Sequence, residues 1–155
     1  MKYFSKKIRN QYGEFDSKSE YERFLHLKHL EYIGAISDLK QQVRFEIIPK
    51  LMKEVRIQLK TKVKIEQRVE EKAAHYTCDF TYINSSGQYV ISEVKSTGTA
   101  LARDYPLRRK LIKQVIHSHN KEVGFEDWIF EEYIPTKTKK NKNGKESGKT
   151  KGKVH

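Results

Sequence analysis

The chain has 155 residues and a mass of 18.4 kDa, which predicts a single domain. Hydrophobic residues make up 36% and the mean hydropathy is −0.84, so we expect a modest core; the longest uncharged apolar runs are only a few residues, which excludes a transmembrane helix. Residues 1–7 contain no apolar segment typical of a secretory signal. Together with the single cysteine, Cys78, this predicts a soluble protein of a reducing compartment, the cytoplasm.

The charge of the chain favours a polyanionic partner. The formal net charge is +12 and the pI is about 9.6, values that point to nucleic acid first. Residues 136–155 contain eight lysines and one acid, with almost no apolar residue to bury. We therefore predict a domain over residues 1–135 and a disordered Lys-rich tail over 136–155, which would act as a nonspecific DNA arm.

The first half of the chain predicts a helix and a strand. The run 17–20 fits a capping box, apolar residues then recur with helical spacing, and Gly34 follows the predicted helix 17–33. Residues 42–48 alternate as a strand that Pro49 ends. Residues 51–72 have two interpretations: alternating Val and Ile suggest extended arms, while their Lys, Glu and Gln content also suits a helix.

The second half predicts a hairpin, a helix and a strand. Residues 76–83 and 88–95 form the two arms of the hairpin around a turn at 84–87, and Tyr76, Cys78, Phe80 and Tyr82 are expected on one face. A helix over about 105–119 and a strand over 128–134 follow. This order predicts an α/β sandwich with a small mixed sheet flanked by helices.

The hairpin predicts a cluster of charged side chains. If its turn has three residues, 85–87, then Asp79 lies opposite Glu93; with two or four residues the pair is diagonal but still within side-chain reach. Strand alternation places Lys95 on the same face as Glu93. Two neighbouring carboxylates repel each other, and a hard cation such as Mg²⁺ relieves that repulsion. A nearby lysine can orient a water or neutralise phosphate charge, so the cluster suits metal-dependent phosphodiester hydrolysis.

The arrangement Asp79, hairpin, Glu93-Val94-Lys95 resembles the active-site signature of the PD-(D/E)XK nuclease superfamily. Cys78 stands where the proline of that signature would be. The predicted element order is similar to the αβββαβ, restriction-endonuclease-like core of the superfamily. Within it, residues 14–118 resemble small phage-encoded endonuclease-like proteins.

The resemblance implies a role for each site residue. Asp79 and Glu93 would ligate Mg²⁺, with Mn²⁺ as a substitute, and Lys95 would position the attacking water. Glu20 would complete the site as a metal or water ligand, and Gln42 would support it. The implied function is a metal-dependent DNA endonuclease in phage or prophage replication and recombination, including branched-DNA or junction processing. Junction processing would require a homodimer, because two strands must be cut.

Several alternatives remain open. Glu20 could simply close the capping box with Ser17, which would make Glu22 the next candidate, and Gln42 could face solvent. A catalytically silent DNA-binding accessory protein on the same fold fits the charge equally well, and an RNA-directed protein is a third reading. Five basic residues around the second helix form either a solvated face or a DNA-binding surface: Arg103, Arg108, Arg109, Lys110 and Lys113.

Overall fold

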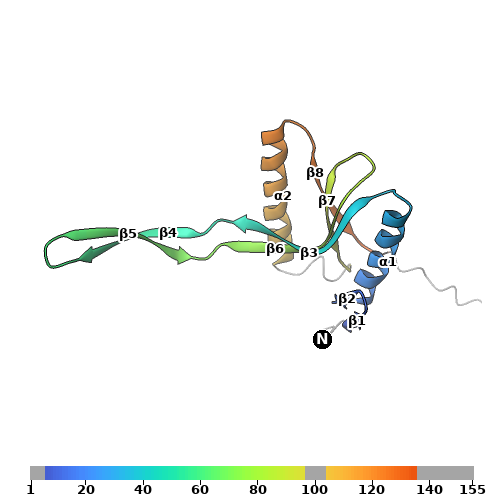
Figure 1. Cartoon of the computed structure of the whole chain (residues 1–155), viewed down its shortest axis with the longest axis horizontal. Coiled ribbons are helices and arrows are strands. Elements are labelled where there is room, and N and C mark those ends of the chain that lie inside the picture. Colours follow the sequence, from blue (N-terminus) through green and yellow to red (C-terminus); the bar gives the residue numbers. More distant parts are fainter. Residues whose placement is uncertain (1–5, 97–103, 136–155) are drawn as a thin grey trace, which may run out of the picture.

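A computed structural model of the chain describes residues 6–96 and 104–135. The elements run in the order shown in Figure 1: β1 (Ile8–Asn10), β2 (Gly13–Phe15), α1 (Lys18–Tyr32), β3 (Ser37–Ile48), β4 (Leu51–Gln58), β5 (Val63–Glu71), β6 (Ala74–Ile83), β7 (Tyr89–Val94), α2 (Tyr105–Val123) and β8 (Trp128–Tyr133). None of the helices in the described ranges is long and apolar enough to cross a bilayer.

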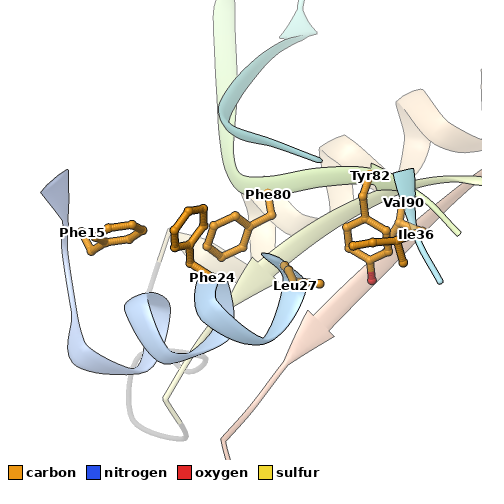
Figure 2. Packing of buried hydrophobic residues seen from close by; sticks show 7 residues of the cluster. All are labelled: Phe15, Phe24, Leu27, Ile36, Phe80, Tyr82 and Val90. Carbon is orange, nitrogen blue, oxygen red and sulfur yellow. The ribbon is translucent and has the colours of Figure 1, made fainter. Parts of the chain in front are cut away.

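The central sheet has the strand order β3-β6-β7-β8 and is mixed. β3 pairs with β6 and β6 with β7 in antiparallel fashion, while β8 lies parallel to β7. Phe24 of α1 packs in one core cluster with Val90, whereas Ile112 of α2 packs in another with Ile91 (Figure 2 shows the first). Neighbouring strand residues point to opposite faces, so the two helices cover opposite faces of the sheet. The predicted α/β class and mixed sheet are confirmed.

The helix ends follow from their local sequence. Ser17 Oγ accepts a hydrogen bond from the Glu20 N–H at 3.1 Å and so begins α1. Gly34 then takes the left-handed conformation, with φ of +78°. Helix α2 runs four residues beyond the predicted end, because the first glycine able to end it is Gly124, with φ of +86°.

Residues 51–72 form extended arms, and the helical alternative is wrong. β4 and β5 pair as a two-stranded antiparallel ribbon that projects from the body of the molecule (Figure 1). Strand β3 also begins five residues earlier than predicted, since an irregular pairing between Ser37 and Lys40 interrupts the alternation there. The short β1–β2 hairpin was not predicted, because three residues per strand give no measurable periodicity.

Strand β6 changes face in its middle, which corrects the prediction that Tyr76, Cys78, Phe80 and Tyr82 share one face. Tyr76 and Cys78 pack in the cluster under α2, whereas Phe80 and Tyr82 pack in the cluster under α1. The partner strand β3 changes face at the same level, where Gln42 has a φ of +52°. A left-handed residue inside a strand breaks the two-residue alternation, so both strands rotate together at Gln42 and Asp79.

Candidate active site

Asp79 lies where the β6–β7 ladder ends. The register pairs Phe80 with Ser92 and Ile83 with Tyr89, which corresponds to a three-residue turn, one of the turn lengths that the sequence left open. Beyond Phe80 the ladder stops, and the Asp79 carboxylate takes the next position: its Oδ2 accepts the Val94 N–H at 2.8 Å. A side chain thus replaces a backbone acceptor and fixes the aspartate at the strand end.

Gln42 connects Asp79 with Glu20. Its Nε2 lies 3.2 Å from Glu20 Oε1 and makes a longer contact of 3.5 Å with Asp79 Oδ1. Glu20 is only 5% exposed, and its other oxygen accepts the Asp16 N–H at 2.9 Å. Glu20 therefore helps to cap α1, one residue earlier than the capping-box pattern predicts, and also faces Gln42. The Glu20 side chain therefore caps the helix with one oxygen and contacts Gln42 with the other.

Glu93 is held from two sides. Tyr76 donates its hydroxyl to Glu93 Oε2 at 2.8 Å, and Lys95 Nζ lies 2.6 Å from Oε1. The Glu93 side chain is 6% exposed and that of Lys95 is 24% exposed. Lys95 Nζ also lies 4.8 Å from the centre of the Tyr105 ring, a cation–π contact that orients the ammonium group.

Burial and mutual repulsion shape the protonation of the carboxylates. Loss of solvent, and next the negative charge of Glu93, raise the pKa of Asp79 to about 7. Burial is also the main cause of the raised pKa of Glu20, to which Glu93 adds a smaller repulsion. Burial and the neighbouring Glu93 charge raise the pKa of Tyr76 well above its ordinary value, so its hydroxyl remains a donor. The site therefore concentrates negative charge, which a cation would relieve.

A pocket of about 480 Å³ opens over part of this cluster, and Glu93 is not among the residues that line it. Its wall includes Glu20, Asp79 and Lys95, and Lys6 and Lys18 contribute positive charge at the same pocket. A concave site with a few convergent polar groups is the usual form of a binding site for a small group such as a phosphate. The remaining lining residues are Asp16, Ser17, Ser19, Val94 and Ser96.

The donor chemistry of the cluster suits a hard divalent cation. Five of the six oxygens of Glu20, Asp79 and Glu93 accept a hydrogen bond within the chain, and Glu93 Oε1 forms the ion pair with Lys95. Across the described ranges, no three His, Cys, Asp or Glu side chains are arranged to hold a metal ion among them. Mg²⁺ commonly uses only one or two protein carboxylates, with water and substrate phosphate completing its shell. Asp79 and Glu93, with their shared excess of negative charge, fit that role.

The basic residues of α2 divide into several environments. Arg108 lies over the Tyr76 ring at 5.6 Å, next to the residue that holds Glu93. Arg109 binds Glu132 at 2.9 Å, and Lys113 lies 5.4 Å from the centre of the Phe130 ring. Lys110 is exposed and lines a separate pocket with Arg109 and Lys113. Arg103 lies outside the described residues, as does the predicted tail over 136–155.

Two tyrosines of the site were not identified from the sequence as functional. Tyr76 looked like one more aromatic of a buried strand face, and Tyr105 like the first residue of a helix. The available signal is general: a buried tyrosine hydroxyl needs a hydrogen-bond partner. Here the partners are Glu93 for Tyr76 and Glu132, at 2.6 Å, for Tyr105.

Comparisons with known proteins identify a family for the chain but no individual relative. Neither the curated proteins nor the solved structures contain a match. One family model matches residues 1–129, a span that includes β1 to β7, α2 and the whole carboxylate cluster. The chain therefore belongs to the family described as Protein of unknown function (DUF1064).

Proposed function

We propose that the protein is a Mg²⁺-dependent DNA endonuclease that hydrolyses phosphodiester bonds, with the restriction-endonuclease-like core of the PD-(D/E)XK superfamily. One observation carries the proposal: Glu20, Asp79 and Glu93 act electrostatically on one another beside Lys95, at the end of two adjacent strands. Such a concentration of acidic groups with one lysine is costly for folding, and structural need alone does not account for it.

The residues of the chain divide the work as follows. Asp79 and Glu93 would hold Mg²⁺, which supplies Lewis acidity toward the phosphate oxygens when bound. Lys95, oriented by Glu93 and by the Tyr105 ring, would place the attacking water and offset charge on the phosphate. Gln42 would keep Glu20 and Asp79 in register across the two strands.

DNA is the favoured substrate because the chain is strongly basic. The net charge of +12 provides the sequence-independent attraction to phosphate on which such an enzyme depends. Arg108 and Lys110 lie on exposed positions of α2, on the helix whose first residue, Tyr105, contacts Lys95. We infer a role in phage or prophage DNA replication or recombination, which includes branched substrates.

The test is a cleavage panel on purified protein. Plasmid, single-stranded and four-way-junction DNA are incubated with Mg²⁺, Mn²⁺ or EDTA, and products are resolved on denaturing gels. We expect metal-dependent cleavage of at least one DNA form, reduced at least 100-fold by Asp79→Asn and by Lys95→Met. Glu22, the alternative to Glu20, is exposed and paired with Lys18, so Glu22→Gln is a control on α1 and should cleave normally. Absence of cleavage on every DNA form would reject the enzyme.

A non-catalytic DNA-binding accessory protein is the second candidate. The observation in its favour is that all six oxygens of the three carboxylates already have a partner in the chain: five accept a hydrogen bond, and Glu93 Oε1 is ion-paired with Lys95. A metal titration followed by calorimetry separates the two functions. The endonuclease requires Mn²⁺ binding that Asp79→Asn removes, whereas the accessory protein would bind DNA with no such metal affinity.

A further inference from the structure

The β4–β5 ribbon is a projecting element without a partner in the described fold. Its two strands make their main contacts with each other, and it extends away from the sheet and both helices (Figure 1). Eight residues at about 3.3 Å each give β4 a length of roughly 25 Å. Most residues of β4 and β5 are exposed, so their side chains are available to a partner.

Charge is segregated along this ribbon. The outer half, residues 55–65, contains four basic residues and no acid, whereas the inner half, residues 49–54 and 66–73, contains four of each sign. Lys64 at the tip is paired with Glu66 at 2.7 Å. The other three cations, Arg56, Lys60 and Lys62, have no ion-pair partner among the described residues. Lys50, Lys53 and Lys72 of the inner half are likewise without an ion pair among the described residues, but acidic residues balance their charge there. The net positive charge of the ribbon therefore lies in its outer half.

Apolar side chains lie among these cations on both faces of the ribbon. The register pairs Arg56 with Ile65 and Ile57 with Lys64, so each of these cross-strand pairs joins one cation to one apolar residue. Ile65 is 55% exposed and Val63 is 53% exposed. Such pairs suit a groove in which cations reach phosphates on the rims and apolar groups contact sugars and base edges.

We propose that the β4–β5 ribbon is a DNA-binding arm that docks in a groove of duplex DNA through its cationic tip. The major groove, about 12 Å wide, admits a two-stranded ribbon. Residues 46–74 contain no Phe, Tyr, Trp or His. Single-strand binders use aromatic stacking platforms, and membrane-surface elements commonly use aromatic anchors, so both alternatives are disfavoured. The inference takes DNA as partner from the proposed function but does not require cleavage.

The experiment measures binding of a fluorescein-labelled 30-bp duplex by anisotropy in EDTA, where cleavage cannot contribute. The tip variant Arg56→Gln/Lys60→Gln/Lys62→Gln is compared with the matched base variant Lys50→Gln/Lys53→Gln/Lys72→Gln. Both remove three positive charges from the same ribbon, so they leave the same net charge. We expect the tip variant to bind roughly tenfold or more weakly, with the log–log salt slope reduced by about 3, and the base variant to stay within threefold.

Other outcomes overturn the arm while leaving the nuclease proposal intact. Equal losses in the two variants would show only a general charge effect. Tip-dependent binding to phosphatidylserine vesicles with unchanged duplex binding would assign the arm to a membrane. A dimer that Val63→Ser/Ile65→Ser converts to a monomer, without loss of duplex affinity, would assign it to a second copy of the chain. Conversely, loss of duplex binding by the tip variant, together with cleavage by the wild type, would support both the DNA-binding arm and the endonuclease.

Discussion

The carboxylate of Asp79 binds the backbone N–H of Val94 across 2.8 Å, where a regular ladder would continue with backbone acceptors. This bond fixes the aspartate at the position where the backbone pairing of β6 and β7 ends. It also keeps a carboxylate in a desolvated position near Glu93. The Asp79 and Glu93 carboxylates therefore repel each other in the folded protein, and this repulsion should affect stability.

Stability of the metal-free protein should fall as the pH rises from 5 to 8. The pKa of Asp79 is raised to about 7 in the folded state, against about 3.9 in the unfolded state. Its contribution to the free energy of unfolding is therefore fully present below about pH 4 and is lost as the pH rises through 7. The raised pKa of Glu20 acts in the same direction. We expect the free energy of unfolding to fall by about 2 kcal/mol between pH 5 and pH 8, as measured by urea denaturation in EDTA.

Two variants separate this effect from general charge. Asp79→Asn removes the titrating group and should flatten the pH dependence while raising stability at pH 8. Asp38→Asn changes an exposed aspartate paired with Lys40 and should retain the wild-type slope. A wild-type protein equally stable at pH 5 and pH 8 would contradict the desolvated position of Asp79.

Substitutions at Gln42 should reveal backbone strain. The φ of +52° disfavours any side chain with a Cβ, so Gln42→Gly should be more stable than Gln42→Ala by about 1 kcal/mol. Both variants lose the amide that bridges Glu20 and Asp79, which makes them a matched pair. Chemical denaturation measures the difference, and an alanine variant as stable as the glycine variant would argue against the left-handed conformation.

Tyr76→Phe should destabilise the protein by about 1–2 kcal/mol. The hydroxyl donates to the buried Glu93 at 2.8 Å, and its loss leaves a charged acceptor with one fewer donor. In the background of Glu93→Gln the same substitution should cost less. A double-mutant cycle by thermal denaturation measures this coupling, and additive effects would mean that the two side chains do not interact.

Lys95→Met should lower both the stability of the protein and its cleavage of DNA. A second substitution, Glu93→Gln, should restore the stability but not the cleavage. Removal of the ammonium leaves the buried Glu93 charge without its partner, which costs about 2–3 kcal/mol. Adding Glu93→Gln removes that charge and should recover most of the stability, while cleavage stays absent. Cleavage by the double variant would contradict the roles proposed for both Lys95 and Glu93.

The sequence by itself determined the main helices, the hairpin and the proximity of Asp79 to Glu93, while it left the exact hairpin register open. The spacing of Asp79 and Glu93 around a three-residue turn predicted their proximity, because strand pairing follows from turn length. Ser17 and Gly34 predicted the limits of α1, since caps depend on neighbouring residues alone. The acidic cluster was therefore accessible before any coordinates.

Tertiary structure alone decided which side chains complete that cluster. The shared change of face at Gln42 and Asp79 breaks the alternation that sequence reasoning assumes, and no local pattern announces a left-handed glutamine. Tyr76 and Tyr105 reach the site from β6 and α2 through packing between elements distant in sequence. Periodicity records which residues are buried, but the partners of a buried polar group depend on how the elements dock.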